Sequence, residues 1–191
     1  MTNHADKIRQ LFEESIETKR RAIAMADAIS ESANQLIAAL RAGNKVLICG
    51  NGGSAADAQH FAAELVGRFE REREPLPAIA LTTDSSMLTA WSNDYGFETV
   101  FSRQVAALGQ PKDVLVGIST SGESPSVLRA MEEAGRRGMA RIALTGRSGG
   151  RLVAIPDVCA LVVPAEQTSR IQEVHITIIH IWARLIEEAL A

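Results

Sequence analysis

Two segments of the chain each place polar side chains on one face of an expected helix. His60 and Glu64 are four residues apart, and Asp57 precedes His60 by three. Residues at these spacings share a helix face. The C-terminal segment carries Gln172 and His180, which fall on one stripe of a second expected helix. The two segments together offer the side chains of a polar site.

These side chains would support two kinds of chemistry. One is general acid–base catalysis, in which a carboxylate removes a proton and an imidazole returns one. The other is binding of zinc or a similar divalent ion by mixed His, Glu and Gln ligands. Spacing alone is also compatible with histidines that are merely packed or exposed, so the residues by themselves leave all three interpretations open.

Two polar loops follow apolar runs that predict strands. The first is Gly50-Asn51-Gly52-Gly53-Ser54, whose glycines let the backbone pass close to a ligand. The second is Ser119-Thr120-Ser121-Gly122-Glu123-Ser124, which runs into Pro125, a typical first residue of a helix. Capping explains Ser124 but not the other hydroxyls, and hydroxyls beside free N–H groups suit a phosphate monoester. Neither loop matches a dinucleotide or nucleotide-triphosphate motif, so a small phosphorylated ligand is predicted.

The elements that must position these loops alternate between strand and helix. Short apolar strands are predicted at 46–49, 78–81, 113–118, 140–145 and 158–163. Strands that are apolar almost throughout are typical of a parallel sheet covered by helices on both faces. Ligands of such sheets bind beyond the carboxyl ends of the strands, where both polar loops lie.

The remaining segments predict helices and connections. Two helices are expected within 5–41, and packing against another subunit is preferred for them over a lid on the sheet edge. The charged stretch 69–77 is interpreted as a solvated loop without chemistry. A helix over about 86–92 is followed by a turn at Asn93-Asp94-Tyr95-Gly96. The last helix is expected over 169–191.

Composition excludes several classes of protein. The 191 residues suit a single domain, and a net charge of −3 argues against a general nucleic-acid binder. No apolar run is long enough for a membrane-spanning helix, and the charged N-terminus lacks a signal-peptide pattern, which predicts a cytoplasmic protein. Cys49 and Cys159 lie in apolar runs and are expected in strands rather than in a disulfide or a metal site.

Four motifs together resemble the sugar isomerase (SIS) domain family, and within it the members that act on phosphorylated heptoses. They are CGNGGSAADAQHFAAEL, the NDYG turn, GISTSGES and RIQEVHITIIH, in this order along nearly the whole chain. The resemblance implies one SIS domain over 1–191, with helices in 1–42 ahead of a flavodoxin-like core with five parallel strands over 43–191. It also implies a homotetramer with sites at subunit interfaces.

The resemblance implies the isomerisation of sedoheptulose 7-phosphate to D-glycero-D-manno-heptose 7-phosphate, toward the heptose of bacterial lipopolysaccharide. Glu64 and His180 match the proposed base and acid, with Glu64 abstracting the carbon proton and His180 serving the oxygens of an enediol. Residues that match the substrate-binding set are Asn51, Gly52, Gly53, Glu64, Asn93, Asp94, Ser119, Thr120, Ser121, Ser124 and Gln172, and those that match the zinc-binding set are His60, Glu64, Gln172 and His180.

Helix geometry limits how Gln172 and His180 share one metal. Their backbones are about 12 Å apart along a helix at roughly 1.5 Å per residue. Both reach one ion only with long, opposed rotamers; otherwise His180 acts mainly in catalysis, or different subunits contribute.

Two other functions are weighed against the isomerase. Relatives of this family act as non-catalytic scaffolds that bind a bacterial replication initiator protein, and SIETKRRAIAMADAISESANQLI is similar to their N-terminal stretch. A scaffold needs no proton-transfer pair, and this chain keeps one, so the enzyme is preferred. A sugar-phosphate sensor would need the hydroxyl-rich loop without Glu64.

Overall fold

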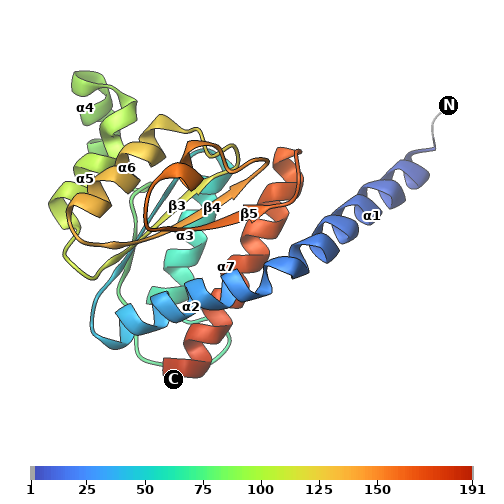
Figure 1. Ribbon diagram of the computed structural model, residues 1–191, viewed down its shortest axis with the longest axis horizontal. Coiled ribbons are helices and arrows are strands. Elements are labelled where there is room, and N and C mark those ends of the chain that lie inside the picture. Colours follow the sequence, from blue (N-terminus) through green and yellow to red (C-terminus); the bar gives the residue numbers. More distant parts are fainter. Residues whose placement is uncertain (1–2, 191) are drawn as a thin grey trace.

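A five-stranded parallel sheet forms the centre of the protein, and the computed structural model describes residues 3–190 (Figure 1). The strands lie in the order β2-β1-β3-β4-β5, which is the order of flavodoxin-like folds. Their bounds are β1 Val46–Gly50, β2 Ala78–Ala80, β3 Val114–Ser119, β4 Ala140–Gly146 and β5 Val158–Val163. All five predicted strands and the predicted parallel sheet are confirmed.

Alternation along the strands divides the core into two layers. In β1, Val46 and Ile48 pack on one face of the sheet, whereas Leu47 and Cys49 pack on the other. Successive side chains of a strand point to opposite faces, so an apolar run of this kind buries both. Cys49 is buried in β1 and Cys159 lies in β5, both as free thiols, as the sequence predicted.

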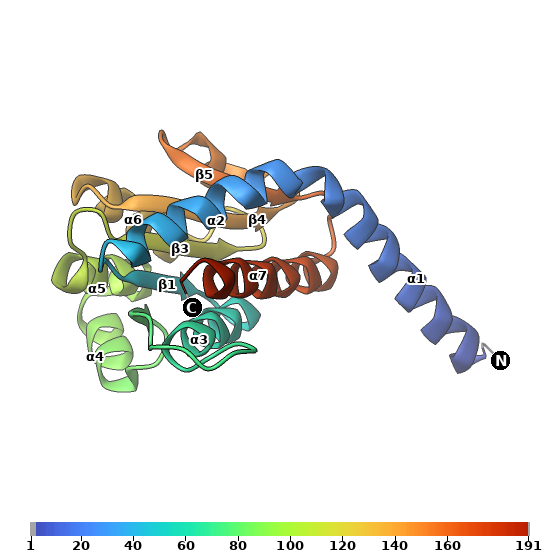
Figure 2. The ribbon, with the colours of Figure 1, turned by 90° about the horizontal axis from the view of Figure 1, so that it is seen from below.

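Helices cover both faces of the sheet. The face lined by Val46 and Ile48 packs against α2 Ala26–Arg41, α3 Gly53–Val66 and α7 Thr168–Leu190. The opposite face packs against α5 Val100–Leu108 and α6 Pro125–Arg136, with α4 Ser85–Tyr95 beside them. Short 3-10 turns occupy Ile23–Met25, Phe97–Thr99 and Gly150–Ala154. Figure 2 shows α3 and α7 side by side on one side of the sheet.

The two N-terminal helices run into one another. Helix α1, His4–Ala22, continues through the 3-10 turn Ile23–Met25 into α2 without a break. The first part projects away from the body of the protein (Figures 1 and 2). Ile8 and Phe12 on α1 are 53% and 68% exposed. The apolar stripe of α1 covers no part of the sheet, whereas α2 packs on the sheet face lined by Val46 and Ile48, so the expectation that both helices pack against another subunit is wrong for α2.

The structure departs from the sequence-based expectation at two connections. Asn93 and Asp94 lie in the last turn of α4, not in a separate turn, because the helix continues until Gly96, whose φ of 85° ends it. The stretch 69–77 is not wholly solvated, because the Arg73 side chain is only 3% exposed. Among residues 3–190, no helix is long and apolar enough to cross a membrane.

Candidate active site

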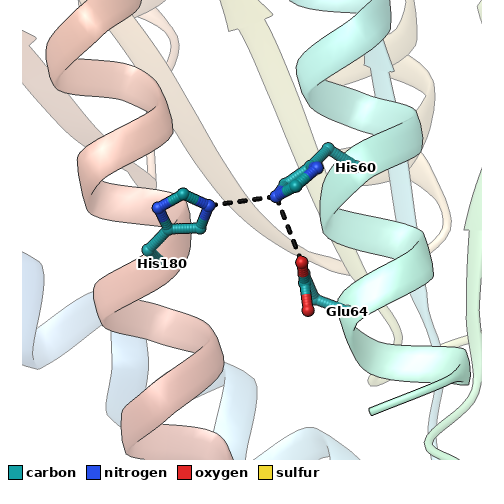
Figure 3. A group of neighbouring side chains, drawn as sticks. All are labelled: His60, Glu64 and His180. Carbon is teal, nitrogen blue, oxygen red and sulfur yellow. Dashed lines mark hydrogen bonds and ion pairs between the residues drawn. The ribbon is translucent and has the colours of Figure 1, made fainter. Parts of the chain in front are cut away.

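His60, Glu64 and His180 meet where α3 packs against α7 (Figure 3). His60 Nε2 lies 3.0 Å from His180 Nε2 and 3.1 Å from Glu64 Oε1. The four-residue spacing on α3 puts His60 and Glu64 on one face, as predicted. His180 reaches them because α7 lies beside α3. The structure therefore joins the two polar segments of the sequence into one cluster, which we name the His–Glu–His cluster.

The cluster is open on one side. The His60 side chain is 44% exposed and that of Glu64 is 18% exposed. The ring of Phe69 covers part of His180, at 5.9 Å between ring centroids. One turn before His60, burial raises the pKa of Asp57 to about 6, although His60 acts in the opposite direction. Among residues 3–190, the Oδ2 atom of Asp57 is buried without a hydrogen-bond partner.

The donor set of the cluster fits a divalent metal ion. One ligand atom from each of the three residues lies within 4.8 Å of the other two. Zinc–ligand bonds of 2.0–2.2 Å in a tetrahedron place ligand atoms about 3.3 Å apart, so small side-chain movements would admit the ion. Two imidazoles and a carboxylate with an open side match the three-ligand pattern of catalytic zinc sites. The residues therefore fit zinc.

Gln172 lies elsewhere on the same pair of helices. A Cβ atom on Gly53 would come within 2.4 Å of Gln172 Nε2, so the amide packs against the first turn of α3. Gly53 is seven residues before His60, about 10 Å along the helix. Of the four residues predicted as metal ligands, the structure brings three together. The amide of the fourth, Gln172, lies at the first turn of α3, away from the other three.

The two polar loops lie together at the carboxyl edge of the sheet. β1 and β3 are neighbours, and Gly50 at the end of β1 pairs in register with Ile118 of β3. Asn51 Nδ2 donates to Ser126 Oγ at 2.9 Å, which joins the first loop to the start of α6. Both loops therefore lie at the carboxyl ends of the strands, where the sequence predicts them.

In the part of the chain that the structure describes, the hydroxyl-rich loop leaves the start of α6 without a side-chain cap. Ser124 is the N-cap residue, but its side chain caps no backbone N–H group. Its Oγ instead accepts a hydrogen bond from Ser119 Oγ at 3.1 Å. Gly122, at a φ of 68°, lies so close to Gly149 that a Cβ atom would overlap the Gly149 carbonyl. Free N–H groups and hydroxyls at a helix start suit a phosphate.

Asn93 and Asp94 are not brought to the His–Glu–His cluster. Both are exposed at the end of α4, a helix that packs with the layer on the other face of the sheet. The interaction that the structure gives their side chains is a mutual hydrogen bond of 3.0 Å. Within one copy of the chain, they stand apart from the residues that carry the acid–base chemistry.

His175 is a buried structural histidine. It lies on α7 with no exposed surface, and its Nε2 donates to the Thr145 carbonyl at 3.1 Å. Burial lowers the pKa of His175 to about 4, although the hydrogen bond to Thr145 opposes that change. His175 thus joins α7 to β4 and lies outside the His–Glu–His cluster.

Three residues near the cluster are not predicted from the sequence. Arg73 and Phe69 come from the stretch 69–77, and Glu187 comes from the end of α7. Arg73 donates to the Glu64 carbonyl, and Glu187 accepts from the backbone N–H of Phe69. Local sequence gives no signal for them, because Arg73 lies in the charged run 70–74, which resembles solvated surface, and Glu187 is one of two adjacent glutamates near the end of α7.

Comparison with known proteins identifies relatives along nearly the whole chain. The SIS domain family model matches residues 3–146. A phosphoheptose isomerase of Roseiflexus sp. is 58% identical, with 94% of this chain and 91% of that protein covered. One from Aquifex aeolicus is 54% identical, with 96% of each covered.

Solved structures agree with these relatives. A phosphoheptose isomerase from Neisseria gonorrhoeae has a TM-score of 0.92 at 47% identity, covering 97% of this chain and 100% of that one. One from Francisella tularensis has a TM-score of 0.94 at 45% identity, covering 98% and 100%.

Proposed function

The chain belongs to the phosphoheptose isomerase family of SIS-domain proteins, and we propose that it converts sedoheptulose 7-phosphate to D-glycero-D-manno-heptose 7-phosphate. The observation that carries the proposal is the His–Glu–His cluster, which assembles a carboxylate and two imidazoles from distant parts of the chain. We place the reaction in the supply of heptose for bacterial lipopolysaccharide. The relatives of 50–63% identity are phosphoheptose isomerases, which supports a sugar-phosphate isomerase.

Isomerisation of a ketose to an aldose moves two protons. One moves between C1 and C2, and one moves between their oxygens, through an enediol. Glu64 is the proposed base for the carbon proton, and His180 is the proposed acid and base for the oxygens. Their closeness to one shared neighbour, His60, supports action on adjacent substrate atoms.

One divalent ion, which we take to be zinc, is the proposed cofactor. His60, Glu64 and His180 would hold it, and Gln172 joins them only if its amide leaves Gly53. When bound, the ion would supply Lewis-acid polarisation of the substrate oxygens. The protein residues still move the protons and orient the sugar.

Substrate binding is proposed to use the carboxyl edge of the sheet. Ser119, Thr120, Ser121 and Ser124 would bind the phosphate through hydroxyls and the uncapped start of α6. Asn51, Gly52 and Gly53 would receive the sugar, because Gly52 adopts a φ of 57° that opens the backbone of the turn. Gln172 lies at the same turn and is proposed to contact the sugar as well.

We propose that the site is completed in a homotetramer. The His–Glu–His cluster is open, and Asn93 and Asp94 are exposed on another helix. Asn93 and Asp94 of one subunit would therefore contact the sugar that is bound at the cluster of another subunit. Helix α1 would pack between subunits, supported by its projecting apolar stripe, whereas α2 packs on the sheet of its own chain. Residues 43–191, together with α2, would form the core of a single SIS domain over 1–191.

The test is turnover by the purified protein. Incubation with sedoheptulose 7-phosphate, with and without added zinc, should yield the aldose product with zinc present. Absence of product under these conditions, together with tight binding to a replication initiator protein, would favour the non-catalytic scaffold instead.

A further inference from the structure

The loop between α3 and β2, residues 67–77, is bound to α7 through the carboxylate of Glu187. Glu187 accepts backbone N–H groups of Phe69 at 3.3 Å, Glu70 at 3.2 Å and Arg71 at 3.0 Å. The residue is only 3% exposed. Three donors from consecutive residues fix the path of this loop against the last turns of α7.

A buried arginine of the same loop closes the end of α3. Arg73 donates to the Glu64 carbonyl at 2.6 Å and to the Leu65 carbonyl at 2.9 Å. Carbonyls in the last turn of a helix lack partners within the helix, so a guanidinium that binds them holds that turn in place. The residue whose carbonyl it binds most closely is the proposed base.

The two charges depend on each other. Both side chains are 3% exposed, and Arg73 Nε lies 4.0 Å from Glu187 Oε1. Burial acts to raise the pKa of Glu187, but the N–H groups of Arg71, Glu70 and Phe69 and the charge of Arg73 lower it below its ordinary value. A buried charge of either sign is costly without its partner, so loss of one releases the other from this arrangement.

The loop also reaches the proposed acid. The ring of Phe69 lies 5.9 Å from the His180 ring, at an interplanar angle of 30°. Because Glu187 holds the Phe69 backbone, the carboxylate on α7 indirectly restrains the imidazole seven residues earlier on the same helix. One short loop therefore contacts Glu64 through Arg73 and His180 through Phe69.

The geometry points to Arg73, Glu187 and Phe69 as positioning residues of the isomerase, which hold Glu64 and His180 at the separation that proton transfer requires. This inference rests on the proposed function. The same contacts also stabilise the last turn of α3, so the test measures thermal stability beside kcat. Small displacements of reacting groups can cost about 100-fold in rate, so a positioning role predicts a large effect from side chains that touch no substrate.

The test compares three variants in the zinc-loaded enzyme. Glu187→Gln keeps the shape but removes the charge, and Phe69→Leu removes the ring while leaving the buried pair intact. Arg184→Gln is the matched control, because Arg184 forms an exposed ion pair with Glu70 of the same loop. kcat, KM and thermal stability are measured for each.

We expect kcat to fall roughly 10–100-fold in Glu187→Gln and several-fold in Phe69→Leu, with KM changed less than about twofold. Arg184→Gln should match the wild type. Phe69→Leu decides the matter if Glu187→Gln does not fold. Wild-type kcat in a folded Glu187→Gln or in Phe69→Leu would overturn the positioning role while leaving the proposed function standing. An inactive wild type would instead overturn the proposed function, and the positioning role with it.

Discussion

His60 Nε2 and His180 Nε2 lie 3.0 Å apart, although 120 residues separate them in the chain. Their approach requires α3 and α7 to pack side by side on one face of the sheet. Neither histidine is unusual in its own segment. The pair, together with Glu64, is what makes this edge of the two helices a candidate for proton transfer and metal binding.

Replacement of the proposed base should separate binding from chemistry. Glu64→Gln keeps the size of the side chain but cannot accept the carbon proton. We expect kcat to fall about 100–10,000-fold, the range for loss of a general base, with substrate binding largely kept. Single-turnover assays and equilibrium titration with the substrate give the two quantities. Equal losses of binding and turnover would make Glu64 a structural or metal residue.

Loss of one imidazole should weaken zinc binding. In His60→Ala, the cluster keeps only two of its three gathered ligands. We expect zinc affinity to fall by more than the roughly 10–100-fold that follows removal of an outer-shell partner. Competitive titration against a chelator measures this. Gln172→Ala is the comparison, because a loss as large as that of His60→Ala would mean that the Gln172 amide leaves Gly53 to bind the ion.

The hydroxyl of Ser124 should contribute to phosphate binding more than to folding. It caps no backbone group and is bonded to Ser119 alone among the described side chains. Ser124→Ala should therefore raise KM about tenfold, equivalent to a charged hydrogen bond of roughly 1.5 kcal/mol, with little change in melting temperature. Competition by inorganic phosphate checks that the loss is at the phosphate. An unchanged KM would place the phosphate elsewhere.

His175 should make the fold sensitive to acid. Its pKa is about 4 in the folded protein, below the ordinary value of 6.5, so the unfolded chain binds the proton more readily between these two values. Stability from this group is complete above pH 6.5 and falls as the pH drops toward 4, by at most roughly 3 kcal/mol. Asp57, whose pKa is raised to about 6, acts in the opposite direction.

The difference between two proteins isolates the His175 contribution. Metal-free wild type and His175→Gln are unfolded with urea at pH 7 and pH 4.5. His175→Gln should lose less stability between these pH values than the wild type. Equal losses would mean that His175 is not the group that titrates.

The apolar stripe of α1 should hold the subunits together. Phe12 is 68% exposed on the projecting part of the helix, so it contributes little to the fold of one chain. Phe12→Asp should lower the mass in solution without lowering helix content, because a buried charge at an interface is costly. Analytical ultracentrifugation with circular dichroism checks both, and Lys7→Asp on the same helix controls for added charge. An unchanged mass would exclude Phe12 from the interface.

Sequence by itself determined the five strands and which polar residues share a helix face or follow a strand. The apolar runs fixed all five strands, because a strand buried on both faces is recognisable from its own residues. His60 and Glu64 share a face because four residues make about one turn of a helix. The local pattern places Ser119 at the end of a strand and Ser124 at the start of the following helix. The roles proposed for these residues remain predictions.

Tertiary structure decided which of these residues meet. The order of strands in the sheet brings α3 beside α7 and leaves α4, with Asn93 and Asp94, in the other layer. It also sets Gln172 against Gly53 and buries Arg73 with Glu187. Contacts between residues more than 100 positions apart depend on the packing of whole elements, which no local pattern encodes. The His–Glu–His cluster is therefore a product of the fold, although each of its residues was visible in the sequence.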